Sequence, residues 1–584
     1  MAYTLKALAK LIQPGQLGLN QAKTLLLFCP FSAYNPQVKF MAHNTNWHPV
    51  PSRKDVLHAT ATLENFYVLE ETRLKFEPTL RVQEWLNDME SLSLDPKSSA
   101  SDQIQSSILF DWQRDGAKFL FSRNRAMLSL SPGLGKTLTS AYAAGLRNFN
   151  NILVVCPASL LYYWKGELEK WAKNLPKQPI PVVCHQKKIS FDAFDHVQQL
   201  WVITNPETAV KYAKDYAQMP FDAMIVDESI MYKHRESNRS QAMKDLAKNF
   251  ETVWFLTGAP ATKNLDDMWH QFHILKPAGY PSYWRFTRSY CLVEDDEWGS
   301  KVIGNRIGAE NKIKKNFADI YFSRTQDDVA NIPDWIMEDV DIPMHPAQDK
   351  AYDILRNELY IRLESVDPGQ IITVGNHLSL MIRSVQVASN PLLVGGVDSA
   401  AKWDALPELM KIYPGPYIIW VNFIETGRMI RDKLGGMGMK TALANGSTSM
   451  EDRNKMVDAF QREELDAIIL NNQVGKFGFT LTKGRTAFFV ERMYDDSYFQ
   501  CLHRNRRIGT VQSPVIVNMR SVTRQGDETI DHLIHDTLDY RVGMIKRVTA
   551  ADLKKVFSSG KRKPKSDNEI LMGEIGKDLG NLIG

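Results

Sequence analysis

A short glycine-rich run, SPGLGKT, has the residue types and spacing of a phosphate-binding loop. Gly133, Gly135, Lys136 and Thr137 stand between an apolar run and an Ala-rich stretch, which predicts a strand, a loop and a helix. In such a loop, backbone N–H groups and the helix N-terminus hold phosphate oxygens, the lysine reaches the β- and γ-phosphates, and the threonine hydroxyl holds Mg²⁺. The strict pattern requires glycine at position 130, where Leu130 stands. An ordinary strand-to-helix turn is therefore the alternative interpretation.

An acidic pair, Asp227 and Glu228, directly follows another apolar run, AMIV. A carboxylate at that place can hold Mg²⁺ through water, and a second one can orient an attacking water. By itself, such a pair is more often a helix N-cap followed by a first-turn acid. Because it follows a phosphate loop in the same predicted sheet, it favours a site that hydrolyses a nucleotide.

A basic segment, QCLHRNRRIGT, contains Gln500, Arg504 and Arg507. Their spacing is i, i+4, i+7, so a helix there would place all three on one face. A solvated stripe and a DNA-binding patch are two interpretations of such a face. If the face lies across a cleft from the phosphate loop, Arg504 and Arg507 would instead stabilise charge on a transferring phosphoryl group.

Two series of short, β-branched apolar runs must position these groups. The first series comprises residues 125–130, 151–156, 200–204, 223–227 and 252–258, and the second comprises residues 416–423, 467–472, 486–491 and 515–519. Longer amphipathic stretches separate the runs, which is typical of parallel strands buried between helices. We therefore predict an α/β protein with two lobes, each built on a parallel sheet, joined between Ile332 and Trp403.

The composition excludes several classes of protein. Of the 584 residues, 44% are hydrophobic and 24% are charged, which is ordinary for a globular chain and excludes a collagen-like or wholly disordered one. A net charge of +4 is too close to balance to indicate a nucleic-acid partner by itself. No apolar stretch approaches the roughly 20 residues of a membrane-spanning helix. The five cysteines form no C-x-x-C pair, which supports neither a disulfide framework nor a zinc site and favours a reducing cytosol.

We predict four segments along the chain. Residues 1–105 do not continue the strand–helix alternation and are assigned to an N-terminal accessory domain, in which the stretch from His43 to Leu57 favours a loop. Residues 106–335 form the first, ATP-binding lobe and residues 336–556 the second lobe. Residues 557–584 form a basic tail, either solvated or in contact with nucleic acid.

Taken together, the motifs resemble those of the Swi/Snf-like ATPases of helicase superfamily two, in order and spacing, over about residues 108–535. The segments that carry the resemblance are ILFDWQRDGAKFL, VVCPASLLYYWKGELEKW, WVITNPETA, LTGAPATKNLDDMWHQFHIL, YFSRTQDDVANIP, ANGSTSMEDRNKMVDAF, LNNQVGKFGFTLT and QCLHRNRRIGT. The chain is similar to the compact annealing or fork-remodelling members and to viral or bacterial relatives. The resemblance implies a helicase motor of two RecA-like lobes.

The resemblance also implies roles for individual residues. Gln113 matches the position that contacts the adenine base, and Trp164 and Trp171 match structural helix positions. The positions implied to lie on the DNA side are Pro157, Ser159, Thr204, Gly475, Thr480 and Thr482. The implied catalytic groups are Lys136, Glu228, Arg504 and Arg507; the implied nucleotide-binding groups are Gln113, Gly133, Gly135, Lys136, Thr137 and Asp227, with Thr137 and Asp227 holding Mg²⁺ through water.

Several positions depart from the family pattern. Leu130 and Ser131 replace an acidic pair before the phosphate loop, and Thr480 and His503 replace the usual residues of the fifth and sixth motifs. The second motif reads Asp-Glu-Ser-Ile, so the histidine that links ATP to DNA in many members is absent. We therefore expect an active ATPase with altered coupling.

The leading hypothesis is an ATP- and Mg²⁺-dependent translocase on duplex or branched DNA, with ATP hydrolysed between the lobes and the DNA held mainly through phosphates. No aromatic hairpin insert that could part strands is evident between the lobes. The alternatives are a strand-separating helicase acting on RNA or branched DNA and a non-catalytic scaffold that binds nucleic acid. A role in DNA repair or recombination and a location in the cytoplasm of a bacterium or a virus-infected cell are expected, with the nucleus an open alternative.

Overall fold

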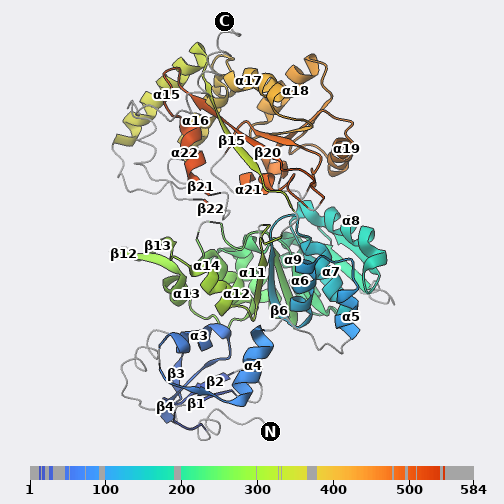
Figure 1. Cartoon of the computed structure of the whole chain (residues 1–584), viewed down its shortest axis with the longest axis vertical. Helices are drawn as coiled ribbons and strands as arrows, with labels where there is room; N and C mark the ends of the chain where they lie inside the picture. The colour runs from blue at the N-terminus through green and yellow to red at the C-terminus, as the bar shows by residue number, and fades with distance from the viewer. Residues whose placement is uncertain are drawn as a thin grey trace. The chain divides into compact units, whose positions relative to one another are not determined.

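The computed structural model describes most of the chain (Figure 1). The described residues are 12–14, 16–19, 25–30, 47–50, 53–72, 74–90, 99–187, 189, 199–262, 264–296, 299–326, 328–329, 332–364, 378–475, 479–492, 497–507, 509–539 and 544–545. The expected basic tail, residues 557–584, lies outside them. The chain divides into two compact units, Met1–Val329 and Ala330–Gly584, which are described in turn.

The first unit contains a seven-stranded sheet in which every neighbouring pair is parallel. Its strands, in spatial order, are β14 (Tyr321–Arg324), β6 (Arg125–Leu130), β11 (Thr252–Thr257), β10 (Ala223–Val226), β7 (Asn151–Val155), β9 (Gln199–Thr204) and β8 (Pro179–Cys184). The five inner strands coincide with the predicted apolar runs, so the prediction of a parallel α/β lobe is confirmed. The two edge strands, β14 and β8, are not among the predicted runs, because β14 is a four-residue strand that ends in Ser and Arg and β8 contains two prolines.

Helices connect these strands. They are α5 (Ser99–Gln105), α6 (Asp111–Phe121), α7 (Lys136–Leu146), α8 (Leu161–Trp171), α9 (Pro206–Lys211), α10 (Ala213–Tyr216), α11 (Asn238–Ala247), α12 (Asp267–Leu275), α13 (Tyr283–Tyr290) and α14 (Ala309–Asn316). Helix α7 is buried from Thr137 to Gly145, because its small side chains let it pack closely against α6 and the sheet. This close packing fixes the start of α7, where the glycine-rich loop ends.

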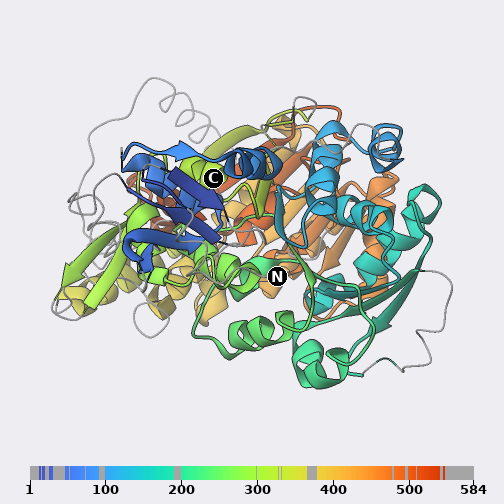
Figure 2. The same cartoon turned by 90° about the horizontal axis from the view of Figure 1, so that it is seen from below.

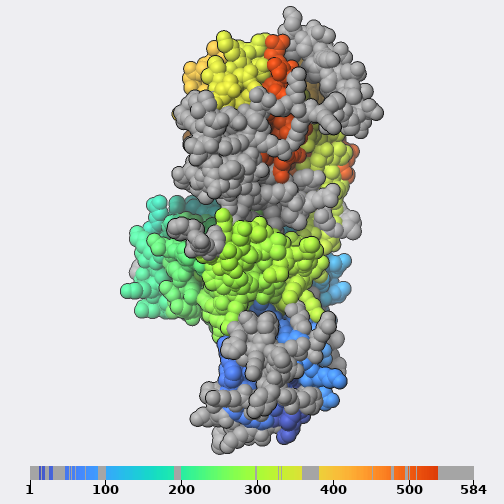
Figure 3. All heavy atoms as spheres, turned by 90° about the vertical axis from the view of Figure 1, so that its left-hand side faces the viewer, coloured from blue at the N-terminus to red at the C-terminus, as the bar shows by residue number. Residues whose placement is uncertain are grey.

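An antiparallel hairpin, β12 (Cys291–Asp296) and β13 (Gly299–Asn305), is inserted in this lobe between α13 and α14. Figures 1 and 2 both show it extending outward from the lobe. The space-filling view of Figure 3 draws this part of the lobe in green, as one continuous surface. The sequence does not predict this hairpin, because its strands mix charged and apolar residues and its turn lacks the usual Asn-Gly signal.

The N-terminal part of the first unit has its own sheet and core. The strands, in spatial order, are β3 (His48–Val50), β4 (Arg53–Thr60), β2 (Leu25–Phe28), β1 (Gln16–Leu19) and β5 (Glu77–Pro78), with α3 (Leu63–Glu71) and α4 (Leu80–Glu90) packed against them. The predicted loop at 43–57 is wrong over β3 and β4. Its Trp47, which suggested a loop beside His and Pro, is fully buried and donates to the Asn65 carbonyl.

This N-terminal part contacts the parallel-sheet lobe through buried polar groups. Lys276 Nζ donates to the Ala61 carbonyl at 3.0 Å and lies 3.0 Å from a carboxylate oxygen of Asp319. Arg123 donates to the Met89 carbonyl at 2.8 Å and to the Asp319 carbonyl at 3.0 Å. These bonds satisfy charges that would otherwise be buried without partners.

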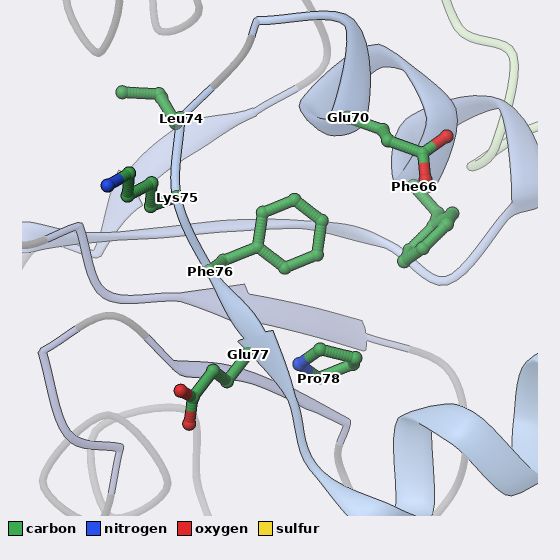
Figure 4. Close-up of a pocket in the computed structure, with 7 residues that line it drawn as sticks. All are labelled: Phe66, Glu70, Leu74, Lys75, Phe76, Glu77 and Pro78. Atoms are coloured by element: carbon green, nitrogen blue, oxygen red, sulfur yellow. The ribbon is translucent and has the colours of Figure 1, made fainter.

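A hollow of about 590 Å³ lies on the N-terminal part (Figure 4). Phe66 and Glu70 line it from α3, and residues 74–78 line it from the segment that leads into and forms β5. The Phe76 ring also makes edge contacts with Phe28 and Phe66, so the hollow opens onto the aromatic core of this part.

The second unit contains a six-stranded sheet that is also wholly parallel. Its strands, in spatial order, are β15 (Ile336–Pro343), β20 (Val515–Val522), β19 (Thr486–Phe489), β16 (Tyr417–Val421), β18 (Ala467–Asn471) and β17 (Thr441–Ala444). Its helices are α15 (Pro346–Glu364), α16 (Leu378–Ser389), α17 (Ala401–Ile412), α18 (Ile424–Gly436), α19 (Met450–Gln461), α20 (Asn472–Gly475), α21 (Ser497–Leu502) and α22 (Ile530–Thr537). The second predicted lobe is thus confirmed.

Alternate residues of its central strand belong to two separate cores. Ile418 and Trp420 pack in one cluster, whereas Ile419 and Val421 pack in the other. This follows from the two-residue period of a strand, which sends successive side chains to opposite faces of the sheet. Among the described residues of both units, no helix is long and apolar enough to cross a membrane.

One buried ion pair joins two helices of the second unit. Lys402 on α17 and Asp531 on α22 are 1% and 4% exposed, and their charged atoms lie 2.6 Å apart. Lys402 Nζ also donates to the Val490 carbonyl, and the same carboxylate accepts from Ser521 N. Removing one partner would leave a buried charge without compensation.

We therefore expect Lys402→Met to lower the free energy of unfolding of the second lobe by about 3–5 kcal/mol. Lys411→Met is the matched control, because Lys411 lies on the same helix and pairs with Glu408 at the surface, where such a pair contributes about 0–1 kcal/mol. Urea unfolding of the full chain measures both. Equal effects of the two substitutions would contradict the assignment.

Candidate active site

The glycine-rich loop runs from the end of β6 at Leu130 to the start of α7 at Lys136. Gly133 and Gly135 have φ angles of 89° and 85°, in the left-handed region that glycine adopts without strain. Leu130 is the last residue of β6 and is fully buried beside Arg324 of β14. The glycine absent from the strict pattern is therefore not needed, because this position belongs to the strand.

Three side chains brace the loop from outside. Trp112 Nε1 and Gln113 Nε2, both on α6, donate to the Leu134 carbonyl at 3.2 and 3.0 Å. Gln326, which follows β14, donates to the Pro132 carbonyl at 2.9 Å. A Cβ on residue 135 would lie 2.1 Å from Gln113 Nε2, so only glycine fits there.

The Gln113 amide is thus engaged with backbone in this structure. Besides donating to Leu134, it accepts from the Phe110 N–H at 3.1 Å. The Phe110 and Trp112 rings stack beside it with centroids 4.7 Å apart. An adenine contact for Gln113 stays a prediction, and the structure adds a bracing role that the motif did not reveal.

Lys136 turns back toward the end of β6. Its Nζ donates to the Leu130 carbonyl at 3.1 Å. The same Nζ lies near Gly258, which follows β11, since a Cβ built on Gly258 would lie 3.4 Å from it. Thr137, the next residue, is nearly buried at the first turn of α7. The ends of β6, β11 and β10 therefore bring Lys136, the Thr257–Gly258 turn and Asp227 to one edge of the sheet, where ligands of parallel sheets bind.

Asp227 follows β10, and its carboxylate is buried with a partner on each oxygen. Trp164 Nε1 of α8 donates to Oδ2, and the backbone N–H of Glu228 donates to Oδ1, both at 2.9 Å. Burial raises the pKa of Asp227, whereas the charge of Lys136 and these two hydrogen bonds act in the opposite direction.

Glu228 has a φ of 51°, which is left-handed and uncommon for a residue with a side chain. Strain of this kind persists where the surrounding structure imposes it, and it concentrates at functional sites. The Glu228 side chain is half-buried, whereas that of Asp227 is buried. The two neighbouring acids therefore differ in their access to solvent.

Ser229, the third residue of the Asp-Glu-Ser-Ile motif, forms a specific hydrogen bond. Its hydroxyl donates to Gln271 Oε1 at 2.8 Å, and Gln271 Nε2 donates to the Pro260 carbonyl at 2.9 Å. This chain of bonds joins the acidic motif to the turn after β11. Gln271 was not among the predicted residues, because a glutamine in the middle of an apolar helix gives no motif signal.

In the second lobe, Arg504 and Arg507 are nearly buried but do not lie on a helix. Helix α21 ends at Leu502, so of the three only Gln500 is helical, and the prediction of one shared helical face is wrong. Arg507 is held by Nε, which donates to the His503 carbonyl at 3.1 Å, and by an NH1 bond of 2.9 Å to Thr480 Oγ1. The turn that follows the helix, closed by Thr510, supplies this geometry.

The positions expected on the DNA side differ in exposure. Pro157 and Ser159 are partly exposed in the turn before α8, and Thr480 is exposed. Thr204 is fully buried and its hydroxyl donates to the Cys184 carbonyl at 2.8 Å, so its side chain cannot contact DNA directly; that expectation is corrected.

The two remaining positions lie in the second lobe. Thr482 accepts a bond from Gln461 Nε2 at 3.1 Å, and Gly475 is the last residue of α20. Neither observation tests a DNA contact.

The oxygen donors at the β10 edge suit a hard cation. A threonine hydroxyl and a carboxylate are ligands that Mg²⁺ accepts, with water completing its shell. The left-handed glycines of the loop and the N-terminus of α7 that follows it suit phosphate oxygens. Thr137, Asp227 and the loop therefore fit a magnesium–nucleotide pair.

Two family models match the chain. The SNF2-related domain matches residues 112–392, and the helicase conserved C-terminal domain matches residues 401–511. The DNA annealing helicase and endonuclease ZRANB3 of Mus musculus is 24% identical over 436 residues, covering 73% of this chain and 39% of that protein. The putative ATP-dependent helicase/translocase YwqA of Bacillus subtilis is 23% identical over 443 residues, covering 69% of this chain and 46% of that protein.

Among solved structures, the SWI2/SNF2 ATPase core of Sulfolobus solfataricus in complex with dsDNA aligns with 71% of this chain and 88% of its own, at 21% identity and a TM-score of 0.35. By contrast, the chain spans less than half the length of the two curated relatives named above.

We expect Lys136→Ala to lower ATP turnover by about a hundred- to a thousand-fold, because the ammonium group compensates phosphate charge. Nucleic-acid binding should persist, since Lys136 points into the loop. Lys248→Ala, at an exposed lysine of the same lobe paired with Asp245, should leave turnover unchanged. Wild-type turnover in the Lys136 variant, measured by phosphate release, would overturn the site.

Proposed function

The chain belongs to the Swi/Snf-like ATPases of helicase superfamily two, and from that membership we propose that it is an ATP-driven translocase on duplex or branched DNA. It carries both domains of an ATP-dependent helicase enzyme. The observation that most supports the proposal is the convergence of Lys136, Thr137 and Asp227 at one edge of the first sheet, beside a strained Glu228.

The proposed chemistry assigns each group one task. The loop at Gly133 and Gly135 binds the phosphates, and Thr137 and Asp227 would hold Mg²⁺ through water. A bound Mg²⁺ would neutralise charge on the phosphoryl oxygens. Glu228 positions the attacking water, and Lys136 stabilises negative charge on the transferring group.

Arg504 and Arg507 of the second lobe are assigned to stabilising negative charge on the transferring phosphoryl group. The two bonds that hold Arg507, to His503 and Thr480, place its guanidinium before the reaction begins. Such pre-organisation is what a group acting on the transition state requires.

The proposed DNA contacts are mainly to backbone phosphates, from the turn at Pro157 and Ser159 and from the segment at Gly475–Thr482. Gripping a backbone requires no base-pair opening.

The relative ZRANB3 is described as a DNA annealing helicase. We propose for this chain likewise that branch migration or annealing occurs only where strands can pair again behind the motor. The net number of base pairs then stays nearly constant, so no wedge is needed.

The test is displacement of the third strand from a triplex, which reports movement along duplex DNA, run beside unwinding of a forked duplex at the same salt concentration. We expect ATP-dependent triplex displacement with weak fork unwinding. Efficient fork unwinding without triplex displacement would establish a strand-separating helicase instead.

We expect Arg507→Ala to lower ATP turnover by about a thousand-fold or more while changing ATP affinity only several-fold, since the group acts mainly in the transition state. Arg428→Ala, at an exposed arginine of the same lobe paired with Glu425, is the control. Steady-state turnover and equilibrium ATP binding are measured together. A parallel, proportionate loss of both would make Arg507 a ground-state binding residue.

A further inference from the structure

One tryptophan of helix α8 contacts the proposed nucleotide site. Trp164 lies in its first turn, is 0% exposed, and donates its indole N–H to Asp227 Oδ2 at 2.9 Å. Its ring stacks on Trp201 of β9, with centroids 6.3 Å apart, which fixes the ring plane. The family motif indicated only a structural position, yet the acceptor is the proposed magnesium carboxylate.

Apart from Trp112, which donates to the Leu134 carbonyl of the phosphate loop, three further indole groups of this lobe have acceptors unconnected with the site. Trp201 donates to the Gln199 amide and Trp254 to the Arg123 carbonyl. Trp171, seven residues after Trp164 on α8, donates to Glu167 of the same helix at 3.0 Å. Trp164 therefore differs from Trp201 and Trp254 in its acceptor and not in its burial, and it differs from Trp171 in both, because Trp171 is half-buried.

The same helix begins at the turn proposed to grip DNA. Strand β7 ends at Val155, the turn contains Pro157 and Ser159, and α8 starts at Leu161. Trp164 lies only about 5–8 Å from that turn along the axis of α8, given a helical rise of 1.5 Å per residue. A movement of the turn would therefore reach Trp164 through a rigid, one-turn connection.

Asp227 is tied to the same strand by its backbone. Its N–H donates to the Val155 carbonyl at 2.9 Å, so β7 and β10 leave the sheet side by side. The Trp164 bond closes a loop of contacts from β7, through the turn and α8, back to Asp227. The outer face of the same helix turn carries Tyr162, which is 58% exposed.

We propose that Trp164 is a positioning residue for Asp227, through which the turn before α8 sets the orientation of the magnesium-binding carboxylate. The coupling to DNA rests on the proposed function; the positioning itself does not. A carboxylate oxygen that accepts one bond keeps further lone pairs for a ligand, so the indole can orient Asp227 without blocking it. Partners of this kind, outside the ligands themselves, typically affect metal affinity by 10–100-fold.

The experiment compares Trp164→Phe with Trp171→Phe in the full chain. Both remove one indole N–H bonded to a carboxylate, from the same helix, but only the first concerns the site. Binding of a fluorescent ADP analogue is measured against Mg²⁺ concentration, without turnover. For Trp164→Phe we expect unchanged binding in EDTA and about a ten-fold higher half-saturating Mg²⁺ concentration. Trp171→Phe should match the wild type. A wild-type Mg²⁺ dependence in Trp164→Phe would overturn the proposal.

Benzothienylalanine at position 164 guards against a folding defect, since it keeps the shape of indole and replaces the N–H by sulfur. It should reproduce the shift seen with Phe while the chain stays folded, as its melting curve shows. A wild-type Mg²⁺ dependence with this residue would likewise overturn the positioning role.

A second measurement tests whether Trp164 couples DNA binding to ATP hydrolysis. It is the ratio of the ATP turnover rate with duplex DNA to the rate without DNA. We expect Trp164→Phe to lower this ratio several-fold at saturating Mg²⁺ and Trp171→Phe to preserve it. An unchanged ratio beside a shifted Mg²⁺ dependence would refute the coupling and keep the positioning role. A wild-type ratio of one would refute the proposed function, while the Mg²⁺ titration still decides the role of Trp164.

Discussion

The burial of the Asp227 carboxylate is the constraint around which the first lobe is arranged. A charge taken out of water must be compensated, and each compensating group comes from a different element: Lys136 from α7, Trp164 from α8, and a backbone N–H from the strained Glu228. The parallel sheet brings these elements to one edge. The fold is thus the means by which a buried carboxylate, an ammonium group and a phosphate loop share one small volume.

The phosphate loop is likewise held by a few specific contacts from neighbouring elements. Its glycines adopt left-handed conformations, and its carbonyls are held by Trp112, Gln113 and Gln326. In the second lobe, Arg507 is likewise held by short-range bonds in advance of any chemistry. Both lobes therefore present groups that are fixed before a nucleotide binds, as expected where electrostatic pre-organisation supplies the catalysis.

Much of this could be predicted from the sequence, because buried parallel strands are continuous apolar runs and the phosphate loop has a fixed spacing. The edge strands β8 and β14, the N-terminal sheet and the β12–β13 hairpin could not, since their strands are very short, contain proline or mix polar with apolar residues. The helical spacing of Arg504 and Arg507 was misleading, because the turn after Leu502 ends the helix. Thr204 matched a motif, but its hydroxyl is used inside the sheet. The roles of Trp164 and Gln271 depend on contacts between distant segments, which spacing does not encode.

The central claim is that ATP turnover in this chain is coupled to duplex DNA. The most direct measurement is the rate of ATP hydrolysis by the full chain without nucleic acid and with single-stranded DNA, duplex DNA, forked DNA or RNA, at matched salt. The account predicts strong stimulation by duplex and forked DNA, and weak stimulation by single strands and RNA. A rate that no nucleic acid raises, or that RNA raises most, would contradict it.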